Sequence, residues 1–211
     1  MTKLQLALDF GTKDEIQALL AELSGMIDIL EIGTPLIIRE GIRFVTEIKQ
    51  TFPATSLLAD LKIMDAGDIE AKMAYEAGAD LVTVLGAAND FTIAAAVRAA
   101  SATDKKIMAD LINVRDIQTR ARQIEQLGVA YLCVHTATDS QRQGLNPLAE
   151  LEEVSRVVPP HKIAVAGGID EALLPRILSY RPAVAIVGSA VTTSADPKNI
   201  ALRLKKILEG A

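Results

Sequence analysis

Eight short apolar runs, rich in β-branched residues, recur along this chain of 211 residues, and they are separated by longer amphipathic segments. Their spacing of about 20 to 30 residues is typical of repeated strand and helix units. The pattern predicts strands at Leu4–Asp9, Ile27–Gly33, Leu57–Ile63, Leu81–Leu85, Lys106–Ile112, Ala130–His135, Lys162–Ala166 and Ala183–Gly188. It predicts helices at segments that include Lys13–Ser24, Ile69–Ala77, Asp116–Leu127, Ala149–Val157 and Pro197–Leu208.

Eightfold alternation of strands and helices favours a (β/α)₈ TIM barrel of the α/β class. No linker rich in proline, glycine or serine interrupts the sequence, so we expect one barrel domain over residues 1–211. The alternative is an open doubly wound sheet, which usually has fewer strands and often a glycine-rich turn after the first. Here the first strand is followed by Phe10-Gly11-Thr12, without a G-x-G-x-x-G motif.

Composition excludes several classes of function. Twenty-two basic and 27 acidic residues give a net charge of −5, and aromatic residues make up only 3% of the chain, which argues against a nucleic-acid groove. The single cysteine, Cys133, lies in an apolar run, where we expect a small core residue rather than a disulfide. With no signal peptide or apolar stretch of about 18 residues, we expect a cytoplasmic protein.

Polar residues gather where the predicted strands end, which is the face on which barrels of this class carry their active sites. They are Asp9 on the first strand, Glu31 on the second, Asp60 and Lys62 on the third, Asp110 on the fifth and His135 on the sixth. Strand alternation places Asp60 and Lys62 on one face, and Asp65 follows in the loop. Such a group can hold a divalent cation and stabilise an oxyanion.

Each of these residues also has a structural alternative. Asp60 and Lys62 could form a simple salt bridge, Glu31 could cap the next turn, and Asp110 could pair with Lys105 or Lys106. His135 could be a core histidine, although a strand-end imidazole can exchange protons near neutral pH. His161 follows two prolines, and we expect it to be exposed. The convergence of five strands on one rim favours a functional site.

Glycine turns follow the last two predicted strands, at Gly167-Gly168 and at Gly188-Ser189. Glycine lets backbone amides approach an anion, and the start of the following helix favours negative charge. Tight turns without a ligand are the alternative. Because barrels of this type commonly bind a phosphate group after strands seven and eight, the pair predicts a phosphate site.

The signature Asp60-x-Lys62-x-x-Asp65, together with Asp9, Glu31 and the two glycine turns, resembles the orotidine monophosphate decarboxylase suprafamily. Within that group the chain is similar to the 3-hexulose-6-phosphate synthase family from about Leu4 to Leu208. The segments that carry this likeness are 58–67, 110–114, 133–139 and 164–168. The resemblance implies an aldolase of the lyase class that condenses formaldehyde with D-ribulose 5-phosphate to give 3-hexulose 6-phosphate through a 1,2-enediolate.

The resemblance also implies a role for each candidate residue. Mg²⁺, or Mn²⁺ in its place, would be bound by Glu31 and Asp60. The catalytic groups would be Lys62, Asp65, Asp110 and His135, and the substrate would be bound by Asp9, Gly168, Gly188 and Ser189. The suprafamily implies a homodimer in which Asp65 reaches the neighbouring site.

Two other functions remain open at this point. The related 3-keto-L-gulonate-6-phosphate decarboxylases carry an arginine where this chain has Thr138 and another where it has Ser189, and both departures weaken that reading. Orotidylate decarboxylase is metal-independent and would not need Glu31, while ribulose-phosphate epimerase uses histidine ligands. A non-catalytic sugar-phosphate-binding barrel is the other alternative, but phosphate binding alone needs no metal-binding carboxylates.

Overall fold

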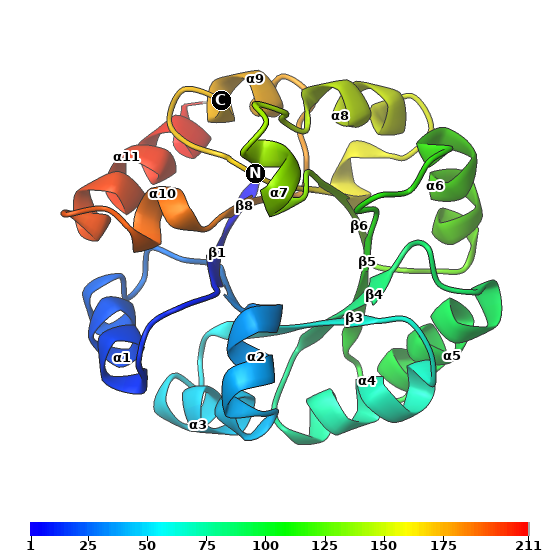
Figure 1. Ribbon diagram of the computed structural model, residues 1–211, viewed down its shortest axis with the longest axis horizontal. Helices are drawn as coiled ribbons and strands as arrows, with labels where there is room; N and C mark the ends of the chain where they lie inside the picture. The colour runs from blue at the N-terminus through cyan, green and yellow to red at the C-terminus, as the bar shows by residue number, and fades with distance from the viewer. Residues whose placement is uncertain (211) are drawn as a thin grey trace.

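Eight parallel strands pair in chain order and close into a barrel, with β8 returning to β1 (Figure 1). This computed structural model describes residues 1–210. The strands are β1 (Lys3–Leu8), β2 (Ile29–Ile32), β3 (Ser56–Ile63), β4 (Leu81–Leu85), β5 (Lys106–Asp110), β6 (Tyr131–His135), β7 (Ile163–Ala166) and β8 (Val184–Val187). The predicted TIM barrel is therefore confirmed, and every predicted strand end lies within two residues of the observed one.

The helices form a ring outside the strands (Figure 1). They are α1 (Lys13–Glu22), α2 (Thr34–Glu40), α3 (Arg43–Thr51), α4 (Gly67–Glu76), α5 (Asp90–Ser101), α6 (Ile117–Gln126), α7 (Thr138–Gln141), α8 (Leu148–Ser155), α9 (Leu174–Leu178), α10 (Ser189–Thr192) and α11 (Pro197–Glu209), with a 3₁₀ turn at Pro160–Lys162. None of the helices within residues 1–210 combines the length and apolar character needed to cross a membrane.

Strand alternation divides the core into two layers. In β1, Leu4, Leu6 and Leu8 are buried against the helices, whereas Gln5 and Ala7 face the inside of the barrel. The interior is filled by small and medium apolar side chains from the other strands, namely Ile29, Leu58, Leu81, Met108, Cys133, Ala164, Ala166, Val184 and Ile186. Cys133 is a buried free thiol, which confirms its expected place in the core.

Strand β3 departs from regular geometry near its end. Its register against β4 shifts between Ala59 and Ile63, and Lys62 has a left-handed backbone with φ of 50°. The Lys62 N–H donates to the Thr83 side-chain oxygen at 2.9 Å instead of continuing a regular ladder. A left-handed backbone at a non-glycine residue costs about 1 kcal/mol. The strained residue is the one whose ammonium group contacts Asp60.

Candidate active site

Asp60 lies buried at the centre of the carboxyl-terminal rim and is surrounded by donors. Its side-chain oxygens accept hydrogen bonds from the Thr34 hydroxyl at 2.8 Å and the Thr83 hydroxyl at 2.7 Å, and from the Lys62 ammonium. Burial alone would raise the pKa of Asp60, but Lys62 and the two hydroxyls together lower it below its ordinary value of 3.8. Asp60 is therefore a fixed negative charge at neutral pH.

Glu31, on the neighbouring strand β2, is also buried and accepts a hydrogen bond of 2.5 Å from the Gln5 side-chain amide. Burial and the negative charge of Asp60 raise the pKa of Glu31 from 4.5 to about 8. Two carboxylates on adjacent strands thus share one low-dielectric region. The arrangement is electrostatically unfavourable unless a proton or a cation joins it.

The Lys62 ammonium lies between two carboxylates. It contacts Asp60 directly and lies 3.7 Å from the nearer Asp110 oxygen. Burial would lower the pKa of Lys62, but Asp60 and Asp110 raise it above its ordinary value of 10.5. The salt bridge between Asp60 and Lys62, expected as a structural alternative, does exist, but as one part of a larger charged cluster.

His135 and Asp110 form a second pair on strands β6 and β5. The His135 Nδ1 lies 2.9 Å from an Asp110 oxygen, while the other Asp110 oxygen accepts the N–H of Ile112 at 2.9 Å. An Nδ1–H donated to Asp110 leaves Nε2 to exchange protons. Burial lowers the pKa of His135, but the hydrogen bond and charge of Asp110 outweigh it and raise the pKa above 6.5.

Asp110 does not pair with Lys105, so that alternative is wrong. Lys105 instead contacts Asp80 at 2.7 Å, near the opposite end of the barrel, because Lys105 precedes β5 whereas Asp110 ends it. Lys106, the first residue of β5, contributes no ion pair to Asp110 either among residues 1–210. His161 is exposed, as expected.

Asp9 lies on the same rim, directly after β1. Burial and the charge of Asp60 raise its pKa above the ordinary 3.8. The backbone of Gly33 passes so close to Asp9 that a Cβ at that glycine would lie 2.0 Å from a carboxylate oxygen. Only glycine fits there, and its absence of a side chain leaves the Asp9 carboxylate at the rim.

Asp65 is the one predicted catalytic residue that the structure does not bring into this cluster. It lies in the loop after β3, as the sequence predicts, and is exposed. Within residues 1–210 its carboxylate accepts a hydrogen bond from the adjacent Ala66 N–H at 2.8 Å and forms no ion pair.

The two glycine turns lie at the ends of the neighbouring strands β7 and β8. Gly168 has φ of +68°, and Gly167, with φ of +107°, passes so close to Thr136 that a Cβ would lie 2.6 Å from the Thr136 carbonyl. Gly188 caps α10, whose first hydrogen bond is donated by the Val191 N–H to the Gly188 carbonyl. The amides of Ser189 and Ala190 precede that bond, as at any helix start, and are available to an anion.

The donor set at Glu31 and Asp60 fits Mg²⁺. Among residues 1–210 no cluster of three or more histidine, cysteine, aspartate or glutamate side chains could enclose a metal ion. Mg²⁺, however, is usually held by one or two carboxylates and completes its coordination with water and substrate oxygens. The Gln5 side-chain oxygen is buried beside Glu31 without a hydrogen-bond partner, which adds a third hard oxygen atom to this region.

Three side chains of the site were not predicted from the sequence: Gln5, Thr34 and Thr83. Gln5 on β1 and Thr83 on β4 occupy inward-facing positions. Because side chains alternate between the two faces of a strand, the sequence pattern could have identified them. Thr34 could not be found this way, because it begins α2 and reaches Asp60 only through the packing of that helix on β3.

Comparison with known proteins gives a consistent assignment. Residues 2–204 match the model of the family described as Orotidine 5'-phosphate decarboxylase / HUMPS family. A 3-hexulose-6-phosphate synthase of Bacillus subtilis is 48% identical over 206 residues, which cover 98% of each chain.

Solved structures agree with the family match. The crystal structure of 3-hexulose-6-phosphate synthase from Salmonella typhimurium has a TM-score of 0.96 and 41% identity, and covers 99% of each chain. The 3-keto-L-gulonate-6-phosphate decarboxylase of Vibrio cholerae is less similar, with a TM-score of 0.87 and 26% identity over 99% of this chain and 98% of its own. The chain therefore belongs to the Orotidine 5'-phosphate decarboxylase / HUMPS family.

Proposed function

We propose that this chain is an aldehyde-lyase that condenses formaldehyde with D-ribulose 5-phosphate to give 3-hexulose 6-phosphate. The full-length relatives with 48% and 40% identity are both named 3-hexulose-6-phosphate synthase, which supports this assignment. The structural observation that carries the proposal is the continuous charged cluster from Asp60 through Lys62 and Asp110 to His135. It combines a fixed cation with an oriented imidazole, as enediolate chemistry requires.

His135 would move the proton in this reaction. Its Nε2 takes a proton from C1 of ribulose 5-phosphate, and the electron pair of the C–H bond forms the 1,2-enediolate. C1 of the enediolate then attacks the carbonyl carbon of formaldehyde, and the oxygen of formaldehyde becomes an alkoxide that takes up a proton. Asp110 holds the imidazole in the required orientation through its hydrogen bond to Nδ1 and stabilises the imidazolium form.

Lys62 would stabilise negative charge on the enediolate. Because its pKa is raised, the side chain remains an ammonium and acts as a cation rather than as a base. Glu31 and Asp60 would hold Mg²⁺ (or Mn²⁺), which when bound supplies a second positive charge for the substrate oxygens. Asp9, directly after β1, would contact substrate hydroxyls.

The substrate phosphate would be bound by backbone amides at Gly168, Gly188 and Ser189. These residues lie at the ends of adjacent strands, on the same rim as the charged cluster. The strands and helices of both regions belong to one closed barrel, and we propose that residues 1–211 form a single domain.

We also propose that the enzyme works in the cytoplasm, where phosphorylated sugars are made and retained.

A homodimer would complete the site. An exposed apolar patch surrounds the loop that carries Asp65, with Met64 54%, Ile69 59%, Met73 52% and Phe91 84% exposed. The starts of α4 and α5 touch, since a Cβ at Gly67 would lie 2.1 Å from the Thr92 carbonyl, so these side chains belong to one region. A second copy of the chain could bury this patch and receive Asp65 near its own Lys62.

The experiment that tests the function compares two substrates with the purified protein. We expect Mg²⁺-dependent formation of 3-hexulose 6-phosphate from ribulose 5-phosphate and formaldehyde, abolished by EDTA and restored by Mg²⁺ or Mn²⁺. Release of CO₂ from 3-keto-L-gulonate 6-phosphate at a higher kcat/KM would favour the decarboxylase instead. Binding of ribulose 5-phosphate without turnover of either substrate would favour a non-catalytic barrel. Full activity in thoroughly metal-stripped protein would contradict the assignment of Glu31 and Asp60.

A further inference from the structure

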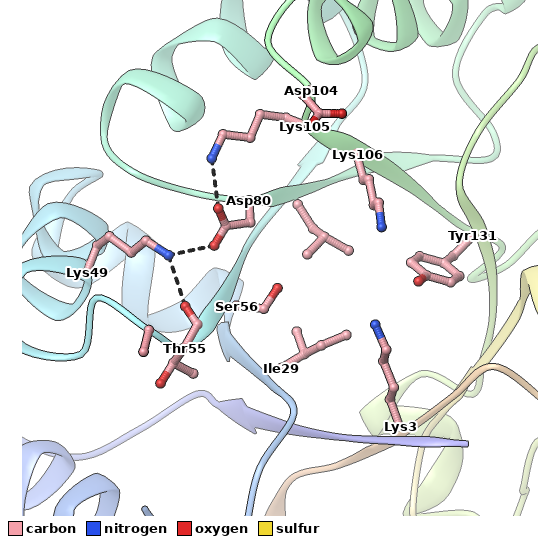
Figure 2. A pocket seen from close by; sticks show the side chains of 12 residues that line it. Lys3, Ile29, Lys49, Thr55, Ser56, Asp80, Asp104, Lys105, Lys106 and Tyr131 are labelled. Atoms are coloured by element: carbon pink, nitrogen blue, oxygen red, sulfur yellow. Dashed lines mark hydrogen bonds and ion pairs between the residues drawn. The ribbon is translucent and has the colours of Figure 1, made fainter. Parts of the chain in front are cut away.

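A cavity lies at the opposite end of the barrel from the charged cluster, where the strands begin (Figure 2). Its volume is about 350 Å³, and its lining includes residues at the starts of six strands: Lys3, Ile29, Ser56, Leu81, Lys106 and Tyr131. A cavity of this size can hold a small metabolite. None of the residues assigned to the proposed catalytic site lines it.

The cavity is positively charged although the whole chain is acidic. Four lysines line it, and the only carboxylates in its lining are Asp80 and Asp104, so its local charge is +2 in a chain whose net charge is −5. Asp80 is already occupied, since its two oxygens contact the Lys49 and Lys105 ammonium groups at 2.7 Å each. These bridges link α3 to β4 and to the start of β5, which accounts for two of the lysines structurally.

Lys3 and Lys106 have no such explanation. Neither side chain takes part in an ion pair within residues 1–210. Both residues are exposed, and Figure 2 shows their side chains extending into the cavity from strands on different sides of the barrel. Asp104 lies beside Lys105 on the rim and does not join them. Within residues 1–210 neither ammonium group is neutralised by a carboxylate, so both can donate hydrogen bonds to an anion that enters the cavity.

The rest of the lining indicates what kind of anion would fit. The buried side chains of Ile29 and Leu81 supply an apolar surface, Tyr131 an aromatic ring, and Ser56 a hydroxyl group. We propose that this cavity binds a small phosphate monoester, with its phosphate between Lys3 and Lys106 and its organic part against Ile29, Leu81 and Tyr131. Charge-assisted hydrogen bonds from two ammonium groups suit a dianion. This inference does not depend on the proposed reaction.

The test uses inorganic phosphate and glycerol 2-phosphate as probes, titrated calorimetrically in EDTA. The Gly188→Asp variant removes the proposed catalytic phosphate site, so binding that remains belongs to the cavity. In that background we expect one saturable site for each probe, and Lys3→Gln with Lys106→Gln should raise its dissociation constant roughly tenfold or more. A matched control is Lys198→Gln with Lys206→Gln, two exposed lysines on α11, which changes the net charge equally and should leave the constant within about twofold.

A second measurement locates the site without any variant. In the wild-type protein, the amide chemical shifts of Lys106 and Tyr131 should change during the phosphate titration. Both changes should follow one saturation curve. The Lys3→Gln, Lys106→Gln double variant should keep its kcat/KM for the proposed condensation, which separates this site from the catalytic one. Absence of saturable binding in the Gly188→Asp background and of shifts at Lys106 and Tyr131 would overturn the proposal. So would an equal loss of affinity in the control pair, or binding of phosphate with exclusion of glycerol 2-phosphate.

Discussion

Replacing Glu31 by glutamine would measure the electrostatic cost of the two buried carboxylates. In the metal-free protein, burial and Asp60 raise the pKa of Glu31 from 4.5 to about 8. Between these two values the folded state keeps a proton that the unfolded chain has released, so the free energy of unfolding falls as the pH rises. Below pH 4.5 and above pH 8 both states carry the same charge at this residue, and its contribution no longer changes.

The size of the effect follows from the shift. One pKa unit corresponds to ~1.4 kcal/mol, so at pH 8 the buried charge of Glu31 costs up to ~5 kcal/mol. Local relaxation and coupling to Asp60 reduce this value, and we expect Glu31→Gln to raise the free energy of unfolding by about 2 to 5 kcal/mol at pH 8 in EDTA. Glutamine keeps an oxygen that can accept the Gln5 hydrogen bond. The control Glu153→Gln, at an exposed position of α8, should change stability by less than about 0.5 kcal/mol.

The assay is urea unfolding of both proteins from pH 5 to pH 8.5. In EDTA the wild-type curve should fall with pH more steeply than the Glu31→Gln curve, and the two should approach each other near pH 5. The pKa of His135 is also raised, so its contribution to the free energy of unfolding likewise falls as the pH rises. This contribution is present in both proteins and cancels in the comparison. Added Mg²⁺ should stabilise the wild type more than the variant. Equal pH slopes for the two proteins would refute the reasoning.

Four further predictions concern catalysis. His135→Asn should lower kcat roughly 100-fold or more with a smaller change in KM, and should slow exchange of the substrate C1 proton with solvent deuterium in the absence of formaldehyde. Exchange at the wild-type rate would make Asp110 the leading base. In the wild type, kcat/KM should fall as the pH drops through a His135 pKa above 6.5, since the imidazolium cannot accept a proton. Gly188→Asp should raise KM for the sugar phosphate strongly, and the uncharged control Gly188→Asn should raise it much less. Both variants should fold, because a Cβ at this position meets only ordinary van der Waals contacts. An unchanged KM in Gly188→Asp would mean that the phosphate binds elsewhere. Refolding an equal mixture of Asp65→Ala and Lys62→Ala chains should restore about a quarter of the activity, because each hybrid dimer regains one site; no recovery would contradict the sharing of Asp65.

The sequence predicted most of the fold because the periodicity of each strand is a local property. Strand alternation along β1 places Leu4, Leu6 and Leu8 on the face opposite to the inward-facing Gln5, as the structure shows. The same reasoning brought Glu31 and Asp60 to one rim, because all strands of a parallel barrel end on the same side. Strand order and site location therefore follow from pattern alone.

Pairings between elements were harder to predict, because they depend on register and packing. Lys105 forms an ion pair with Asp80, which lies four residues after the end of α4. From the sequence alone, Asp110 was an equally good partner for Lys105. The bulge in β3 and the left-handed backbone of Lys62 arise from pairing with β4, which no local pattern reveals. In the homodimer that we propose, the position of Asp65 relative to the neighbouring site would depend on how the two chains assemble, which one sequence or one chain does not contain.

The closed order of the barrel also determines where the molecule can be attached to something else. Lys3 is held to β8 through its N–H bond to the Ala183 carbonyl at 2.8 Å, and Lys205 near the end of α11 contacts the carbonyl of Gly25 in the turn that precedes β2. Both ends of the described segment, residues 1–210, therefore lie on the side where the strands begin. A fusion partner or surface anchor joined to either terminus would leave the opposite end of the barrel, which carries His135, open to substrate. The same handle would crowd the lysine-lined cavity, so tag-free protein is the appropriate material for titrating it.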